Sequence, residues 1–142
     1  MNELSASAPG NFPHDSDTFR LAILDDNGGT FGYVQFVDAE YAQIRSDGDL
    51  FKVLSASDDD FYIISSGKAS GKYLGITPNH WVYAISTFRL APAWEFKGDF
   101  FEEMFTNQNL SAKELQIGEY LAAWSTTGSY RSLRVRKEPH QG

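Results

Sequence analysis

An amide, an imidazole and an indole side chain follow one another at Asn79, His80 and Trp81, and Tyr83 comes two residues later. Saccharide binding needs such a combination, because an aromatic ring packs against the apolar face of the sugar. Amide and imidazole groups then bond to the sugar hydroxyls in fixed directions. These four residues are therefore the first candidates for contact with a carbohydrate ligand.

A second candidate site consists of Tyr130 with Ser125 and Thr126, although Tyr130 is also typical of a turn. Structural roles fit the first group as well. Trp81 fits both a platform for a ligand and a structural side chain that plugs one end of the fold, and His80 fits both a ligand contact and a solvated loop residue. The sequence leaves these alternatives open.

Patterns that would support catalysis or metal binding are missing from the sequence. His14, His80 and His140 have no second histidine or carboxylate at the spacing of a metal site or a catalytic dyad. No nucleophile elbow, phosphate-binding loop or dinucleotide-binding glycine pattern occurs. Adjacent carboxylates such as Glu102 and Glu103 would point to opposite faces of a strand. We therefore expect no enzymatic activity, no metal and no other cofactor.

The composition predicts one domain whose partner is not an anionic polymer. The chain has 142 residues, as single domains commonly do, and it has no cysteine for disulfides or thiolate metal sites. A net charge of −7 opposes binding to nucleic acid or to an anionic membrane. No apolar run approaches the ~18 residues of a transmembrane helix, and no secretion signal is recognisable. We expect a soluble protein, either cytoplasmic or released without a Sec-type signal peptide.

Charged residues gather at two places in the sequence. Arg131, Arg134, Arg136 and Lys137 lie near the end of the chain, where apolar residues alternate with them, so we predict an exposed strand face. The other group, Asp-Asp-Asn at 25–27, fits a turn, although its carboxylates would also suit a calcium ion or sugar hydroxyls.

Apolar residues recur in the same order three times along the chain, about forty residues apart. Residues two positions further on repeat as well, and i and i+2 lie on the same face of a strand. Each repeat therefore predicts four short strands that are buried on one face, with the phenylalanines and Trp94 in the core. The four series are Phe19, Phe61 and Phe105; Val34, Leu74 and Leu115; Ile44, Ile85 and Trp124; and Phe51, Trp94 and Leu133.

A unit of this length cannot close a core alone, so the three repeats are expected to share one. We place them at about 18–57, 58–100 and 101–136. Residues 1–17 are rich in serine, proline and aspartate and are interpreted as a flexible arm, and residues 137–142 as a short tail.

One segment of the third repeat carries two conflicting patterns. A capping-box pattern that begins at Ser111 and a helical apolar spacing from 117 to 124 favour a helix. The repeat register instead predicts two strands, 114–117 and 120–125, separated at Gly118, a residue that weakens a helix. We favour the two strands.

Three repeats of four strands, with the sequence Gly-Lys-Tyr-Leu-Gly-Ile at 71–76, resemble the β-trefoil family. The Gly-x-Tyr-Leu element recurs in fascins, fibroblast growth factors and many trefoil lectins, and Gly-Tyr-Val at 32–34 is similar to it. Trp94 matches the tryptophan of the Gln-x-Trp motif in ricin-B-type lectins. The resemblance covers residues 18–136 and implies an all-β fold with pseudo-threefold symmetry, a six-stranded barrel capped by three hairpins.

The resemblance implies a lectin-like protein whose partner is a glycan or glycoprotein. Trefoil lectins commonly place a site between the second and third strands of a repeat, where residues 79–81 lie. The equivalent residues at 38–41 and 118–120 differ from them, which predicts one competent site and, for avidity, a homo-oligomer.

A protein-binding trefoil is the alternative function, such as a protease inhibitor or a toxin or effector module. An inhibitor needs a long, protruding loop, and the longest candidate connector is 86–92. Phe88 and Arg89 are expected to be exposed at its centre.

Overall fold

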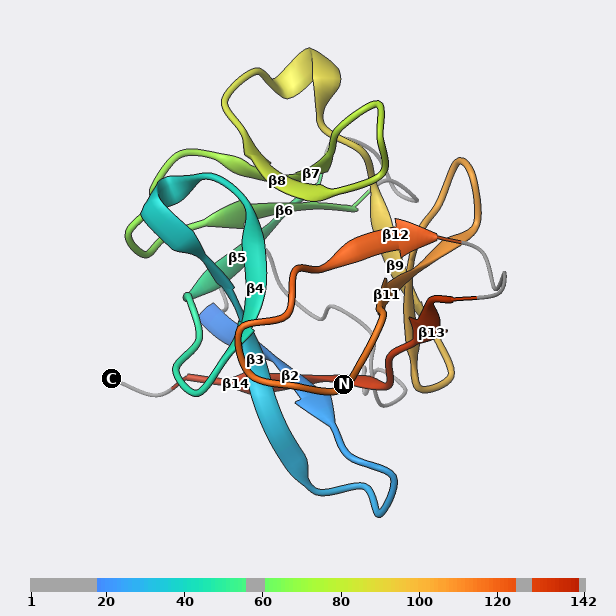
Figure 1. The fold of residues 1–142 in the computed structure, drawn as a ribbon. Helices are drawn as coiled ribbons and strands as arrows, with labels where there is room; N and C mark the ends of the chain where they lie inside the picture. The colour runs from blue at the N-terminus through green and yellow to red at the C-terminus, as the bar shows by residue number, and fades with distance from the viewer. Residues whose placement is uncertain (1–17, 56–60, 125–128, 141–142) are drawn as a thin grey trace, which may run out of the picture.

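A computed structural model describes residues 18–55, 61–124 and 129–140 of the chain. These residues form short strands joined by turns and 3-10 segments, with no α-helix among them (Figure 1). The predicted all-β class is therefore confirmed.

The first strands are β2 (Thr18–Leu24), β3 (Thr30–Phe36), β4 (Ala42–Arg45), β5 (Phe51–Ser55), β6 (Phe61–Ser65), β7 (Tyr73–Ile76) and β8 (Val82–Ile85). The later ones are β9 (Trp94–Lys97), β10 (Phe100–Glu103), β11 (Gln108–Ala112), β12 (Ala122–Trp124), β13 (Arg131–Ser132) and β14 (Val135–Pro139). The 3-10 segments are η1 (Val37–Ala39) and η2 (Phe88–Leu90).

The strands form two sheets, one of which is nearly closed and barrel-like. One sheet has the order β4-β3-β2-β5-β6-β7-β8 with β14 beside β2, and the other has the order β12-β11-β10-β9 with β13 beside β11. The sheets meet where the Val135 N–H donates to the Asp99 carbonyl at 2.8 Å and where Phe100 pairs with Arg134. β14 continues to Pro139, into the segment interpreted as a tail, while the predicted arm at 1–17 lies outside the described residues.

The hairpins β3–β4, β7–β8 and β11–β12 are arranged around the centre of the molecule in Figure 1 and bond to one another there. Each hairpin supplies one backbone carbonyl to the next, so that connectors about forty residues apart in the sequence are brought to one end of the fold. The bonds run from the Ala84 N–H to the Glu40 carbonyl (3.0 Å), from the Ala123 N–H to the His80 carbonyl (2.9 Å) and from the Ile44 N–H to the Glu119 carbonyl (2.9 Å).

Most of the aromatic residues predicted for the core are buried there. Phe19, Phe51 and Trp94 are each no more than 1% exposed, and Phe61 packs against this cluster from a half-buried position. The ring centroids of Phe19 and Phe51 lie 6.4 Å apart across the β2–β5 pair. The spacing of the first and fourth series therefore identified core positions in these strands correctly.

The predicted core position of Phe105 is wrong. Phe105 is 90% exposed, whereas Phe101 is fully buried. The cause is Glu103, whose buried carboxylate holds the chain in a tight turn after β10. Its Oε2 accepts a bond from the Phe105 N–H at 2.7 Å, and its Oε1 accepts bonds from the N–H and hydroxyl of Thr106 at 2.9 and 2.6 Å. The turn leaves the Phe105 ring on the surface.

The segment with two conflicting patterns forms a long turn followed by one short strand. After β11, residues 113–119 run as bends and turns as far as β12. Gly118 has a φ of 93°, a left-handed value that ends any helix, so the chain reverses there. Leu110 and not Leu115 is fully buried. The predicted strand at 114–117 is therefore wrong, and so is the helix.

Gly32 lies where β3 approaches β4 too closely for a side chain. A Cβ at this position would lie 2.9 Å from the Arg45 carbonyl oxygen, a backbone atom that the sheet holds in place. We expect Gly32→Ala to lower the free energy of unfolding by about 1–3 kcal/mol, as overpacking does. Gly67→Ala is the control, because its Cβ would lie 3.4 Å from the nearest atoms, an ordinary contact. Equal melting temperatures for the two variants would contradict this account.

Asp49 is a buried carboxylate whose Oδ2 accepts the Phe36 N–H at 2.8 Å. Burial raises the pKa of Asp49 above the ordinary value of 3.8, although the bond from Phe36 and the charge of Lys68 oppose this rise. The folded state therefore takes up the proton at a higher pH than the unfolded chain does. The free energy of unfolding therefore rises as the pH falls through the pKa that Asp49 has in the folded state. The rise is complete once the pH is below the pKa that Asp49 has in the unfolded chain.

Asp49→Asn should remove this pH dependence, because the amide oxygen still accepts the backbone bond but never carries a charge. We expect the variant to be more stable than the wild type at neutral pH. The difference should shrink as the pH is lowered toward 3.8. Urea unfolding of both proteins between pH 4 and pH 7 measures it. A difference that stays constant with pH would contradict the assignment.

Candidate functional site

A tight turn between β7 and β8 fixes the backbone of Trp81. The Thr77 N–H donates to the Trp81 carbonyl at 2.9 Å, and the Trp81 N–H donates to the Thr77 hydroxyl at 3.1 Å. His80 closes the turn with a φ of 71° and donates its N–H to the Thr77 carbonyl at 2.8 Å. The half-buried indole of Trp81 is therefore held at the end of this hairpin.

Trp81 lines an open pocket together with Tyr41 and Tyr120, and the pocket has a volume of about 280 Å³. The three side chains come from three different connectors, those that follow β3, β7 and β11. The Tyr120 ring meets the Tyr41 ring at 6.4 Å and 89°, and it meets the Trp81 ring at 6.3 Å and 73°. Tyr41 and Tyr120 are 41% and 49% exposed, so a ligand can reach both.

The other predicted residues of the first group lie around Trp81 in different ways. Tyr83 supports the pocket from β8, with its ring 4.9 Å from the Tyr41 ring at 69°. Asn79 is exposed in the turn. His80 faces the Trp124 ring at 4.4 Å, and its Nδ1 lies 2.9 Å from Oε1 of Gln108. The imidazole is therefore already engaged by the protein.

The second predicted candidate, Tyr130, belongs to the same aromatic cluster as the first. Its ring lies 6.3 Å from the Trp81 ring and 5.5 Å from the ring of Trp124. Trp124 was predicted for the core and is half-buried instead. Ser125 and Thr126, the remaining candidates, lie outside the described residues. The structure thus brings the two predicted groups side by side.

Sequence reasoning did not include Tyr41 and Tyr120 among the site residues, although their connectors were compared with that of Trp81. Those connectors differ in most of their residues, which suggested that only the second repeat carries a site. The signal that could have identified them is narrower, since each connector ends in one aromatic residue. The bonds between the hairpins then bring these three residues together.

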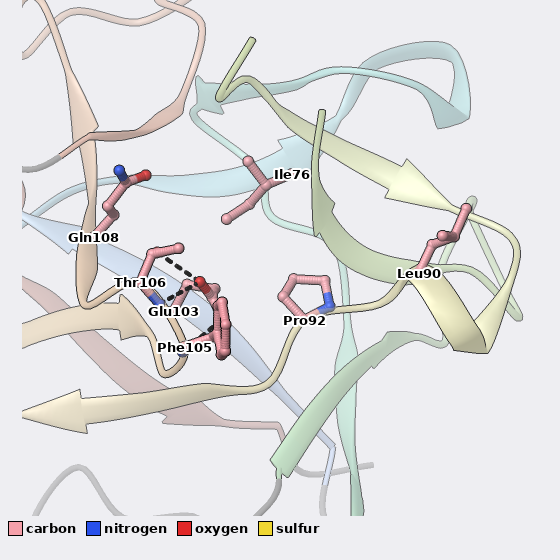
Figure 2. Close-up of a pocket in the computed structure, with 7 residues that line it drawn as sticks. All are labelled: Ile76, Leu90, Pro92, Glu103, Phe105, Thr106 and Gln108. Carbon is pink, nitrogen blue, oxygen red and sulfur yellow. Dashed lines mark hydrogen bonds between the residues drawn. The ribbon is translucent and has the colours of Figure 1, made fainter. Parts of the chain in front are cut away.

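A further pocket, of about 290 Å³, lies between the β10–β11 turn and the loop after η2 (Figure 2). Phe105 and Leu90 line it and are 90% and 69% exposed. Its lining also contains Glu103 and Gln108, but the turn and His80 respectively engage these side chains. The pocket therefore offers a ligand mainly apolar surface.

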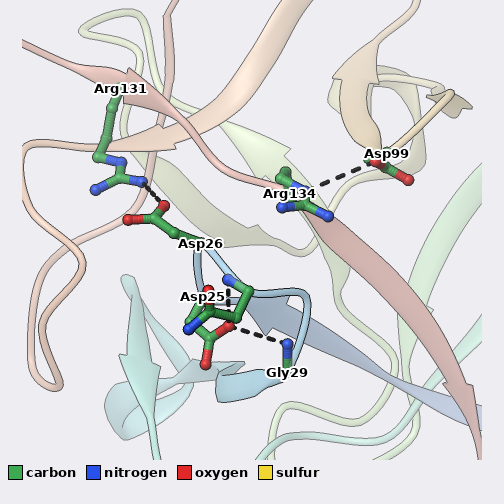
Figure 3. A network of polar contacts seen from close by, with 7 residues as sticks. Asp25, Asp26, Gly29, Asp99, Arg131 and Arg134 are labelled. Carbon is green, nitrogen blue, oxygen red and sulfur yellow. Dashed lines mark hydrogen bonds and ion pairs between the residues drawn. The ribbon is translucent and has the colours of Figure 1, made fainter.

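Two of the three arginines near the end of the chain, Arg131 and Arg134, are paired with carboxylates (Figure 3), whereas Arg136 donates to the Thr30 hydroxyl at 2.8 Å. Arg131 binds Asp26 at 2.9 Å, and Arg134 lies 3.6 Å from Asp99. Asp25 accepts two backbone N–H groups of its own turn, both at 2.9 Å. The Arg131–Asp26 pair joins the β2–β3 turn to β13, and the Arg134–Asp99 pair reaches the β9–β10 turn. Asp25 holds the β2–β3 turn through its backbone bonds, as predicted.

Within the described part of the chain, no group of three or more histidine, aspartate or glutamate side chains is placed to hold a metal ion. None of its helical segments has the length and apolar character needed to cross a membrane. Comparisons with known protein families, curated proteins and solved structures find no match to this chain. The geometry of the aromatic pocket is therefore the basis on which a function can be argued.

Proposed function

We propose that this chain is a non-enzymatic binding module of β-trefoil type that binds a carbohydrate in the pocket of Tyr41, Trp81 and Tyr120. The observation that carries the proposal is the meeting of three aromatic side chains from three connectors in one open pocket of about 280 Å³. Aromatic rings pack against the apolar faces of sugars, and phenolic hydroxyls supply directed hydrogen bonds. The site is thus one pocket shared by three hairpins.

The bonds between the hairpins support the trefoil part of the proposal. A β-trefoil closes one end of a six-stranded barrel with three hairpins around a threefold axis. The carbonyls of Glu40, His80 and Glu119 each bond to the next hairpin in cyclic order, at 2.9 to 3.0 Å. Strands β2, β5, β6, β9, β10 and β14 are candidates for the six barrel strands, since they lie next to one another in that order.

A glycan array tests the carbohydrate proposal. The wild type should bind a restricted set of glycans, and Trp81→Ala should lose that signal because the variant lacks the largest ring of the pocket. Its unfolding free energy should fall by only about 1–2 kcal/mol, since the side chain is half-buried and meets the Tyr120 and Tyr130 rings. Phe105→Ala, which removes a ring from the other pocket, is the control and should keep the signal. Absence of any glycan signal, or a signal that survives in Trp81→Ala, would contradict the proposal.

Protein binding is the second candidate function, and the exposure of Leu90 and Phe105 favours it. The loop between β8 and β9 projects from the top of Figure 1, where η2 carries Phe88 and Arg89. Phe88 is 41% exposed and Arg89 is exposed, as predicted for this loop. A protease inhibitor that binds like a substrate presents an extended chain to the protease, whereas η2 is a 3-10 turn. Inhibition of this type therefore requires the loop to open.

A protease panel separates the second candidate from the first. If the protein binds no glycan but inhibits a protease, and Arg89→Ala abolishes the inhibition, this result would favour the inhibitor and contradict the carbohydrate proposal. Glycan binding with no inhibition would do the reverse. Trp81→Ala serves as the control in the protease assay. Trp81 lies in the aromatic pocket and not in the loop between β8 and β9, so this variant should leave inhibition unchanged.

A further inference from the structure

The rings of the aromatic pocket stand at steep angles to one another and do not form one flat platform. Tyr120 stands at 89° to Tyr41 and at 73° to Trp81, and Tyr83 stands at 69° to Tyr41. Rings at steep angles to one another can present more than one face to a compact group. A ring face carries partial negative charge, so a cation over such faces is attracted, most strongly over an indole.

Carboxylates lie next to this pocket in the sequence. The residue that precedes each pocket aromatic is Glu40, His80 or Glu119. All three carbonyls accept equivalent bonds between hairpins, so the three residues occupy corresponding places around the pocket. His80 is turned toward Trp124, and both glutamates are at least partly exposed. Two of the three residues that directly precede the pocket aromatics in the sequence therefore carry a negative charge.

A protein cation already uses the same aromatic cluster. Nζ of Lys113 lies 5.9 Å from the ring centroid of Tyr130, and the Tyr130 ring in turn lies 6.3 Å from that of Trp81. A net charge of −7 on the whole chain adds a long-range attraction for cations, which salt weakens.

From these observations we infer that the pocket of Tyr41, Trp81 and Tyr120 accepts a quaternary ammonium group, whose methyl groups pack against the rings while its charge is attracted by them. The inference goes beyond carbohydrate binding and does not depend on it. The inference is that the pocket prefers a cationic group to a neutral group of the same shape. It applies to a free organic cation and to a quaternary ammonium group carried on a larger molecule.

Choline and 3,3-dimethyl-1-butanol form the matched pair of probes, because the alcohol has the same shape with a neutral carbon in place of the nitrogen. Calorimetric titration of the full chain should show choline binding about tenfold more tightly than the alcohol, or more. Tyr120→Ala should lose choline binding, and Phe105→Ala should keep it. Equal affinities for the two probes, or no saturable binding of choline, would overturn the inference.

The double variant Glu40→Gln, Glu119→Gln tests the contribution of the carboxylates. Its affinity for choline should fall severalfold while its affinity for the neutral alcohol is unchanged, and an unchanged preference for choline would contradict that contribution. Phosphocholine and trimethyllysine are the two further probes, and the tighter one identifies the carrier of the ammonium group. Neutral glycan binding on an array with no preference for choline would refute this inference and leave the carbohydrate proposal standing.

Discussion

Phe101→Ala is expected to lower the free energy of unfolding by about 3–5 kcal/mol, whereas Phe105→Ala should change it by less than about 0.5 kcal/mol. Phe101 is fully buried, with its ring stacked 4.9 Å from that of Trp94 and tilted against the Phe96 ring at 5.0 Å. Removing it leaves a cavity in the core and ends both ring contacts. Phe105 is 90% exposed, so its removal costs no core contact.

Urea unfolding of the two alanine variants measures this difference. The midpoint of Phe101→Ala should move to much lower urea with an unchanged m-value, and that of Phe105→Ala should coincide with the wild type. The pair is well matched, because the substitution is the same and the sites are four residues apart. A larger loss for Phe105→Ala would mean that the register predicted from the repeats is right and that β10 is wrongly placed.

Trp94→Ala should be similarly severe, with a loss of about 3–5 kcal/mol. The indole is fully buried, and it stacks on Phe101 with an angle of 6° between the rings. Its Nε1 also donates to the Leu74 carbonyl at 2.8 Å, which joins β9 to β7. The alanine variant loses the packing and leaves this buried carbonyl without its donor.

Trp94→Phe separates the two contributions. A phenylalanine ring keeps much of the stack on Phe101 but has no N–H for Leu74, so we expect a loss of about 1–3 kcal/mol from the unpaired carbonyl. Thermal and urea unfolding of both variants give the values. Equal losses for phenylalanine and alanine would show that the hydrogen bond, and not the packed ring, dominates at this position.

The spacing of apolar residues was sufficient to predict strand class and most core positions. Phe19 belongs to the first of the four series and Phe51 and Trp94 to the fourth, and all three are buried in the core, as the spacing predicted. The register failed in the third repeat, since Phe101 and Phe105 are four residues apart and would share a face in an unbroken strand. Glu103 lies between them on that face, and its presence was the indication that the strand ends there.

The pocket could be predicted only in part, because its assembly depends on contacts between hairpins. Trp81 stood out through its neighbours Asn79 and His80, yet its partners in the pocket are Tyr41 and Tyr120. Backbone hydrogen bonds from one hairpin to the next bring these residues together. Any residue other than proline can form such bonds, so the side-chain types in the sequence do not reveal them. His80 was predicted from its chemistry, and the structure shows that Gln108 engages it.

The central claim is that three connectors build one ligand site, and a titration of single variants tests it most directly. The strongest glycan from the array, or choline if no glycan binds, would be titrated into Tyr41→Ala, Trp81→Ala and Tyr120→Ala, with Phe105→Ala as the control. We predict that the wild type binds one ligand per chain and that all three pocket variants weaken this same event about tenfold or more. Binding that only Trp81→Ala impairs, or three ligands per chain, would contradict the shared site.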